Sequence, residues 1–278
     1  MKLWLSKAGS SGLVDSTAAH INPFDHGLTV GDGVFETLKV SYGQPFALTR
    51  HLERLARSMH VLGLPSLDPE EVRQGVHEVV KANSDASMLG RLRITVTSGE
   101  GPLASDRADS QPTVIIALVP MNPWPAHTSA TFTPWRRNEY SPIVGAKSTS
   151  YAENVVALAW ARERGYSEGL FKSTSGYVSE GTGSNIFIVL DGEVLTPPLS
   201  TGCLAGITRD LVIEWCGATE SEFTQEECLA ADEVFLTSST RDVHPVATLD
   251  DREWPAPGPV TLNIARAFHE QARANIDP

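Results

Sequence analysis

Cysteine, basic residues and long apolar runs are all scarce in this sequence, and each scarcity excludes a class of protein. The 278 residues include three cysteines, Cys203, Cys216 and Cys228, without the C-x-x-C spacing of a redox or metal site. We therefore expect a reducing cytoplasm and no metal site. No window reaches the roughly 18 apolar residues that span a bilayer. The first twelve residues also lack the apolar run of a signal peptide.

Positive charge is also in deficit, which limits the partners. The chain has 22 Lys and Arg against 34 Asp and Glu, a formal net charge of −12 at pH 7. Because a chain with this negative charge repels phosphate backbones and anionic lipids, we expect neither nucleic acid nor a membrane as a partner. The length suits one large domain or two modest ones.

Three prolines within six residues, Pro120, Pro123 and Pro125, predict a stiff linker over residues 120–127. The linker would separate a smaller N-terminal domain, residues 1–119, from a larger C-terminal domain, residues 128–278. Many short strands between isolated helices predict an α+β fold rather than a doubly wound sheet.

The hydrophobic pattern predicts the elements of both domains. In the first domain we expect strands at 2–5, 34–40, 46–48, 91–98 and 113–119, loops at 6–18 and 22–27, and helices capped by Thr49 and Asp68. In the second we expect strands at 130–134, 169–172, 185–190, 193–196 and 233–236, and helices at 151–164, 207–215 and 259–274. Asp191 and Gly192 predict a hairpin turn, and Thr224 with Glu227 a capping box.

Two ionisable residues stand out in residues 145–185. Lys147 lies among the small residues Gly145, Ala146 and Ser148, and Glu180 follows a strand-like segment about thirty residues later. By residue type alone, a solvated lysine and a surface glutamate are the more common situations. An amine and a carboxylate held by neighbouring elements could, however, hold the two ends of a flat, charged cofactor.

A series of motifs surrounds these two residues in a fixed order. They are N-P-F-D-H-G at 22–27, G-D-G-V-F-E-T at 31–37, R-H-L-E-R-L at 50–55, Lys147, Y-V-S-E-G at 177–181, S-N-I-F at 184–187, T-P-P at 196–198 and G-I-T-R at 206–209. With these motifs the sequence resembles the class IV aminotransferases, the fold type IV enzymes that use pyridoxal 5′-phosphate. The resemblance runs from about residue 2 to residue 270. It implies a two-domain α+β fold with an α/β-barrel-like C-terminal domain, and a homodimer.

The resemblance also implies roles for individual residues. Lys147 would be the Schiff-base lysine and the proton shuttle, and Glu180 would pair with the pyridine nitrogen of the cofactor. The phosphate would be bound by the helix start at Ile207 and Thr208, and by side chains that match the family's phosphate ligands, Arg50 and Thr240. Asn185 would either order the turn after Glu180 or contact the cofactor.

Substrate contacts are predicted from strand alternation and charge. Phe35, Thr37 and Lys39 point to one face of a strand because side chains alternate along it. Arg241, beside Thr240, could receive a substrate carboxylate or could be a surface arginine. Gly181, Thr182 and Gly183 lack the third glycine and the strand–helix context of a dinucleotide motif. Three scattered histidines, His26, His51 and His244, indicate no metal or Ser–His site.

Within the family, the motifs favour an aminodeoxychorismate lyase, which releases 4-aminobenzoate and pyruvate. One reason is Lys39, which lies where branched-chain transaminases carry an arginine. The alternatives are a D-amino-acid, branched-chain or amine transaminase. A non-catalytic pyridoxal-phosphate carrier and a cofactor-free binding module are other classes, and the presence of both Lys147 and Glu180 favours an enzyme acting on a small amino-acid-like molecule.

Overall fold

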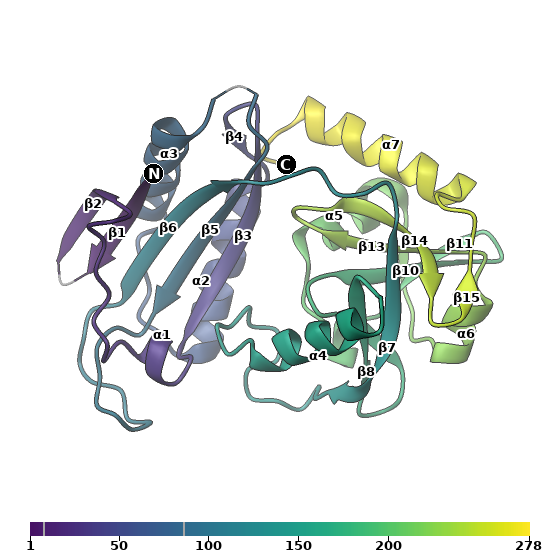
Figure 1. Cartoon of the computed structure of the whole chain (residues 1–278), viewed down its shortest axis with the longest axis horizontal. Coiled ribbons are helices and arrows are strands. Elements are labelled where there is room, and N and C mark those ends of the chain that lie inside the picture. Colours follow the sequence, from purple (N-terminus) through teal and green to yellow (C-terminus); the bar gives the residue numbers. More distant parts are fainter. Residues whose placement is uncertain (8, 86) are drawn as a thin grey trace. The chain divides into compact units, whose positions relative to one another are not determined.

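A computed structural model describes residues 1–7, 9–85 and 87–278 (Figure 1). The chain forms two compact units. Unit 1 comprises Met1–Pro123, Ala146–Tyr151 and Ile276–Pro278, and unit 2 comprises Trp124–Gly145 and Ala152–Asn275. The division falls inside the expected linker. It differs from the expected domains in two short segments, because residues 146–151 and 276–278 return to unit 1 through backbone hydrogen bonds.

Unit 1 is built on a six-stranded antiparallel sheet in the order β2-β1-β6-β5-β3-β4. Its strands are β1 (Lys2–Lys7), β2 (Ser10–Asp15), β3 (Gly33–Ser41), β4 (Gln44–Pro45), β5 (Gly90–Thr97) and β6 (Thr113–Pro120). Its helices are α1 (His26–Thr29), α2 (Leu48–Leu62) and α3 (Pro69–Asn83). Alternate residues of β3 and β5 are buried with the apolar stripes of α2 and α3 in a single core.

Helices α3 and α2 of unit 1 are capped in different ways, the first by a neighbouring residue and the second by a residue far away in the sequence. The Asp68 cap is confirmed, because its side chain accepts a hydrogen bond from the Glu70 N–H at 2.9 Å. The Thr49 cap was wrong. Helix α2 begins at Leu48 after Ala47 in a left-handed conformation, and Asp277 accepts hydrogen bonds from both the Thr49 N–H and its hydroxyl. A carboxylate more than 200 residues away thus does the capping.

Two further expectations for unit 1 were wrong. Residues 10–15, expected in a loop, form strand β2, which pairs with β1 over six residues. Residues 46–48 are not a strand, because Ala47 turns the chain into α2. Strand pairing overrides the weak sequence pattern at residues 10–15, and a turn overrides it at residues 46–48.

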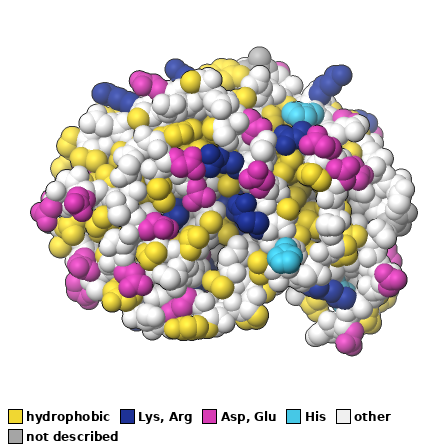
Figure 2. Space-filling model, turned by 180° about the vertical axis from the view of Figure 1, so that it is seen from behind, with side chains coloured by type: hydrophobic (Ala, Val, Ile, Leu, Met, Phe, Trp, Pro, Cys, Tyr) yellow, Lys and Arg dark blue, Asp and Glu magenta, His cyan; other side chains and the backbone are white. Residues whose placement is uncertain are grey.

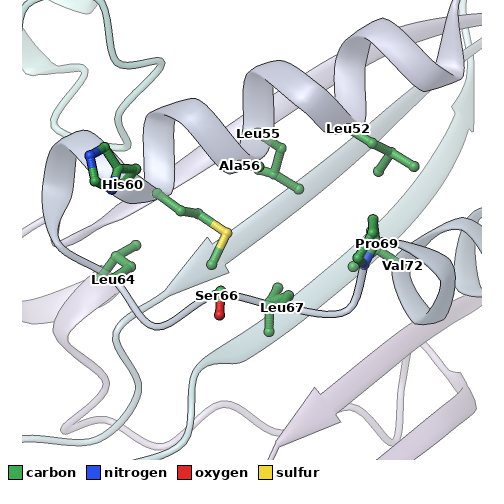
Figure 3. Close-up of a pocket in the computed structure, with 10 residues that line it drawn as sticks. Leu52, Leu55, Ala56, His60, Leu64, Ser66, Leu67, Pro69 and Val72 are labelled. Atoms are coloured by element: carbon green, nitrogen blue, oxygen red, sulfur yellow. The ribbon is translucent and has the colours of Figure 1, made fainter.

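An apolar cavity of about 130 Å³ lies between α2 and α3 (Figure 3). Figure 3 shows side chains of α2, of the following loop and of the start of α3 pointing toward it. Its lining residues are Leu52, Leu55, Ala56, Met59, His60, Leu64, Ser66, Leu67, Pro69 and Val72. Since this lining contains no Lys, Arg, Asp or Glu, the cavity does not suit an anionic cofactor.

Unit 2 contains a nine-stranded mixed sheet in the order β12-β11-β10-β13-β14-β7-β8-β9, with β15 paired to β14. The strands are β7 (Thr128–Arg137), β8 (Glu168–Ser173), β9 (Val178–Gly181), β10 (Asn185–Leu190), β11 (Glu193–Thr196), β12 (Thr219–Glu220), β13 (Glu233–Ser238), β14 (Asp242–Leu249) and β15 (Arg252–Glu253). The helices are α4 (Ala152–Glu163), η1 (Leu199–Thr201), α5 (Ile207–Cys216), α6 (Gln225–Ala230) and α7 (Pro259–Ala274).

Most local signals of unit 2 are confirmed. Asp191 and Gly192 both have positive φ, 53° and 82°, in the tight turn between β10 and β11. Thr224 and Glu227 form the capping box of α6. Strand β14 escaped prediction, because it starts at a charged residue and contains Pro245, although it lies between β13 and β7.

The α+β fold with two sheets is as expected. No helix of the described residues is long and apolar enough to cross a membrane. On the face of the molecule shown in Figure 2, acidic and basic side chains are interspersed with hydrophobic ones.

Candidate functional site

Lys147 is held by its backbone in unit 1. Its N–H donates to the Ser58 hydroxyl of α2 at 3.1 Å, and its carbonyl accepts from the Phe35 N–H of β3 at 2.8 Å. The next residue, Ser148, forms an antiparallel bridge with Val34. The segment that carries the lysine is therefore fixed between a strand and a helix, and its side chain is half-buried.

Aromatic rings surround the Lys147 amine. Its Nζ lies 4.4 Å from the centroid of the Phe35 ring and 5.9 Å from that of Tyr151. The two rings contact each other edge to face at 5.3 Å. The two rings shield part of the amine from water, and cation–π attraction holds it beside their faces.

Arg93 joins this group, and the sequence analysis missed it. Its guanidinium carbon lies 3.7 Å from the centroid of the Phe35 ring. Arg93 is directly opposite Thr37 in the β3–β5 pair, so it shares the face of Phe35. The alternation of β5 could have revealed it, since a second cation, Arg91, lies two residues earlier and pairs with Lys39.

Phe35, Thr37 and Lys39 do share one face of β3, while Val34, Leu38 and Val40 face the core. The Lys39 amine lies 5.8 Å from the Phe46 ring. The face thus combines one buried ring with three cations, Lys39, Arg91 and Arg93. Such a surface can hold a molecule with an apolar part and one or more carboxylates.

On the other face of β3, Glu36 is completely buried. It pairs with the His51 ring nitrogen at 2.6 Å and with the Arg54 guanidinium at 2.6 and 2.8 Å. Burial acts to raise the pKa of Glu36, but Arg54 and His51 outweigh it and hold that pKa well below its usual range. Burial lowers the pKa of His51, against the opposing effect of Glu36. His51 is therefore a core histidine.

Arg50 lies in the first turn of α2. Its Nε donates to the Pro278 carbonyl oxygen at 2.9 Å, next to the Asp277 cap. It is half-buried. The phosphate contact expected of Arg50 stays a prediction.

In unit 2, Glu180 is largely buried in β9, with 12 % of its side chain exposed. One oxygen accepts from the Leu204 N–H at 3.0 Å, and the other lies 3.1 Å from the Arg137 Nε. The Arg137 guanidinium also stacks on the Phe171 ring at 4.3 Å. Arg137, which the sequence analysis missed, thus places a positive charge beside the carboxylate.

Asn185 is the first residue of β10 and contacts Leu204, the residue whose N–H donates to Glu180. Its side-chain amide donates to the Leu204 carbonyl at 2.8 Å, so Leu204 bridges Glu180 and Asn185. A Cβ at Gly206 would come 2.0 Å from the Asn185 amide oxygen. Only glycine fits there, and the residue following it starts α5.

Ile207 and Thr208 form the first turn of α5 and are both buried. Because the N-cap residue is Gly206, no side chain caps this helix start. First-turn N–H groups have no partner within the helix, and the helix dipole is positive at this end. Together with the Thr208 hydroxyl, this turn suits a phosphate group.

Thr240 lies in the turn between β13 and β14, half-buried, and Arg241 follows it. The Arg241 guanidinium pairs with buried Glu168 at 2.9 Å and stacks on the Trp124 ring at 4.2 Å. Arg241 is therefore not a surface arginine. A substrate carboxylate would have to compete with Glu168 for it.

The structure thus gathers the predicted residues in two groups. Unit 1 holds Lys147, Phe35, Thr37, Lys39 and Arg50. The group in unit 2 comprises Glu180, Asn185, Ile207, Thr208, Thr240 and Arg241. Unit 1 thus contains an amine, and unit 2 a carboxylate and a helix start with a hydroxyl; these are the kinds of group that can bind the aldehyde, the ring nitrogen and the phosphate of pyridoxal phosphate.

Comparison with known proteins identifies the family. Residues 33–249 match the family described as amino-transferase class IV, and the chain belongs to that family. It is therefore an enzyme whose cofactor is pyridoxal 5′-phosphate. The predictions of family, fold class and cofactor are confirmed.

Relatives with different names align with most of this chain. The chain is 35 % identical over 264 residues to a putative branched-chain-amino-acid aminotransferase of Methanocaldococcus jannaschii, covering 91 % of this chain and 89 % of that one. It is 30 % identical to a D-alanine aminotransferase of Bacillus licheniformis, covering 92 % and 93 %. It is also 30 % identical to an aminodeoxychorismate lyase of Bacillus subtilis, covering 84 % and 83 %.

Solved structures of aminotransferases superpose on this chain over most of its length. The branched-chain aminotransferase of Thermoproteus uzoniensis with norvaline superposes with a TM-score of 0.89 at 34 % identity, covering 97 % of this chain and 94 % of that one. The pyridoxal-phosphate-bound form of a hypothetical aminotransferase from Mycobacterium tuberculosis has a TM-score of 0.84 at 26 % identity, covering 96 % and 97 %.

Proposed function

We propose that this protein is an aminotransferase that moves the amino group of an amino acid with an apolar side chain to a 2-oxo acid, through Lys147. The observation that carries the proposal is the Lys147 amine beside Phe35 and Tyr151, with the Arg93 guanidinium on the same ring. The half-buried Tyr151 ring offers an apolar surface to a side chain, and Arg93 offers a cation to a carboxylate. Relatives named as branched-chain aminotransferases support the choice.

In this proposal Lys147 performs both the covalent and the acid–base work. Its amine would hold the aldehyde carbon of the cofactor until a substrate amine displaces it, and would then be free to carry a proton to and from the substrate α-carbon. Bound pyridoxal phosphate supplies the electron-withdrawing ring that makes this proton acidic. The two backbone hydrogen bonds of Lys147 keep its chain in place while the side chain moves.

The other residues bind and tune the cofactor. We assign Glu180 to the pyridine nitrogen, where an ionised carboxylate keeps the ring protonated. We assign the phosphate to the first turn of α5 with Thr208, and to Thr240 and Arg50. Asn185 orders the loop at Leu204, and its hydrogen bond to that residue supports this reading over a direct cofactor contact.

The second candidate is the aminodeoxychorismate lyase reaction that the motifs favour. The specific observation for it is the row of three cations, Lys39, Arg91 and Arg93, on the face that bears Phe35. A substrate with a second carboxylate on its ring would find a second cation there. The Bacillus subtilis relative adds support.

Borohydride reduction of the holoenzyme, followed by peptide mapping, tests the role of Lys147. The pyridoxyl group is expected on Lys147. Label on any other lysine, namely Lys2, Lys7, Lys39, Lys81 or Lys172, contradicts the proposal.

A product assay then separates the two reactions. We expect conversion of branched-chain L-amino acids with 2-oxoglutarate, followed as the 2-oxo acid formed. Release of 4-aminobenzoate and pyruvate from aminodeoxychorismate, without transamination, would move the assignment to the lyase. Rapid transfer from D-alanine alone would assign a D-amino-acid transaminase.

We propose in addition that the enzyme is a homodimer. Helix α4 exposes an apolar stripe at helical spacing, Ala152, Val155, Val156 and Ala159, and the two valines are 62 % and 54 % exposed. Exposed apolar stripes of this kind mark protein contacts. Light scattering should give twice the chain mass, and Val155→Lys with Val156→Lys should lower it. A fully active monomer contradicts the proposal.

A further inference from the structure

Glu168, the first residue of β8, is a buried carboxylate without a role in the proposed function. It is 1 % exposed. One oxygen accepts hydrogen bonds from the Thr182 hydroxyl, from the Thr182 N–H at 3.1 Å and from the Gly169 N–H at 3.3 Å. The other accepts from the Ser184 hydroxyl at 3.1 Å and pairs with Arg241 at 2.9 Å. Five donors thus satisfy a charge that burial would otherwise make costly.

Apart from the Gly169 N–H of β8 itself, these donors belong to two turns that carry proposed cofactor contacts. Thr182 and Ser184 lie in the turn that leads from Glu180 to Asn185. Arg241 directly follows Thr240. The Glu168 carboxylate therefore links the turn between β9 and β10 to the turn between β13 and β14, and both turns adjoin candidate cofactor residues.

The packing around Glu168 is close. A Cβ on Gly181 would lie 2.4 Å from the Ser184 hydroxyl and 3.3 Å from the Glu168 carboxyl carbon. The Asn154 amide of α4 donates to the Thr182 carbonyl at 2.7 Å and holds the turn from its other side. The turn therefore has little room to shift while these bonds remain.

We propose that Glu168 is the positioning residue for the cofactor contacts of unit 2, acting through Thr182, Ser184 and Arg241. The inference rests on the proposed function, since it takes Glu180, Asn185 and Thr240 as cofactor-site residues. A carboxylate is needed because all its partners are donors. A glutamine would turn an N–H₂ group toward one set of donors and leave the buried Arg241 charge without its counter-ion.

The test is the affinity of the apo protein for pyridoxal phosphate, titrated by absorbance at a temperature where circular dichroism shows folded protein. Glu168→Gln is expected to raise the Kd at least tenfold. The matched control is Glu233→Gln in the same unit. Glu233 is also buried, but its carboxylate accepts from the Val260 and Thr261 N–H groups at the start of α7. The control should lower the Tm and leave the Kd within twofold.

A second variant keeps the inference testable if Glu168→Gln does not fold. Thr182→Val with Ser184→Ala removes both hydroxyl donors and leaves the Arg241 pair intact. We expect the Kd to rise at least threefold. A Kd within twofold of wild type in the folded variants overturns the inference.

The labelling of Lys147 separates this inference from the proposed function. If wild type is labelled at Lys147 and the Glu168 variants bind cofactor normally, only the role of Glu168 is wrong. If wild type binds no cofactor at Lys147, the proposed function fails and the inference fails with it.

Discussion

Glu36 in unit 1 and Glu168 in unit 2 are both almost completely buried carboxylates, and they are satisfied by different kinds of partner. Glu36 in unit 1 meets two basic side chains, His51 and Arg54, both on α2 and at most 18 residues away. Glu168 in unit 2 meets hydroxyl and backbone N–H donors of one turn, and Arg241 from another strand end. Charged partners on one helix attach that helix to a strand, whereas donors from two turns fix the geometry of those turns.

The same contrast holds for the proposed reactive groups. Lys147 is held through its backbone by Ser58 and Phe35, which leaves its side chain able to move. Glu180 is held through its side chain, by the Leu204 N–H and Arg137. A proton shuttle needs a mobile end on a fixed chain, whereas a partner of the cofactor ring needs a fixed carboxylate. The comparison predicts that loss of the Glu36 carboxylate acts on stability and that loss of the Glu180 carboxylate acts on turnover.

The largest expected effect is that of Glu36→Gln on stability. The substitution leaves the buried Arg54 charge without its counter-ion, so the free energy of unfolding should fall by about 3–5 kcal/mol, measured by urea denaturation. The control is Glu70→Gln, whose carboxylate is 72 % exposed in an i,i+3 pair with Arg73 and should change stability by less than about 0.5 kcal/mol. Equal changes in the two variants would show that the buried Glu36–Arg54 pair contributes no more to stability than an exposed pair.

Glu180→Gln should instead act on turnover. A neutral amide lets the cofactor ring nitrogen lose its proton, so kcat is expected to fall by about 10²–10³, or roughly 3–4 kcal/mol. Cofactor binding, followed by absorbance, and the Tm should change little. Near-normal turnover would show that Glu180 is not the partner of the ring nitrogen.

The pH dependence of stability should reflect unit 1. The folded-state pKa of both His51 and Glu36 lies below the ordinary value, so the unfolded chain binds more protons as the pH falls. Stability should be complete above about pH 6.5, fall as His51 opposes protonation, and fall further below about pH 4.5 as the unfolded Glu36 carboxyl takes up a proton. Urea titrations of His51→Gln should lack the upper part of this decline. If the pH profile of His51→Gln is the same as that of wild type, His51 is not the cause of the upper part of the decline.

The smallest expected effect is that of Ser58→Ala. It removes the acceptor of the Lys147 N–H, at a cost of about 1 kcal/mol in stability, and should lower kcat severalfold as the lysine segment loosens. Ser173→Ala, which removes the hydroxyl hydrogen bond of another buried serine in a hairpin of unit 2, is the control and should leave kcat unchanged. A Ser58→Thr variant should restore kcat. Equal kcat losses in Ser58→Ala and the control would indicate a general structural effect.

The residues that the sequence analysis missed share a physical cause. Arg93, Arg137, Ser58 and Glu168 are ordinary residues for their strands and helices, and each matters through a partner distant in the sequence. Ser58 contacts Lys147 from 89 residues away. No local pattern marks such a residue, because its environment exists only after folding.

Local signals were sufficient wherever a residue acts on its own neighbours. The Asp68 cap, the Thr224 capping box and the turn at Asp191 and Gly192 depend on hydrogen bonds or backbone angles within a few residues. Thr49 had the same local signal and was wrong, because the Asp277 carboxylate occupies the capping position. A cap supplied by a distant residue cannot be distinguished from a local one before folding.

By itself, the sequence determined the α+β class through its hydrophobic periodicity, and its ordered motifs carried the resemblance that implied the family and the cofactor; both are properties of the chain alone. Only the tertiary structure decided that the Lys147 segment belongs to unit 1, that Arg241 is engaged by Glu168, and that Arg93 contacts the ring beside the lysine amine. Each of these depends on which strand, helix or turn packs beside another. Hydrogen bonds and ion pairs act over a few ångströms in space, whatever the distance along the chain.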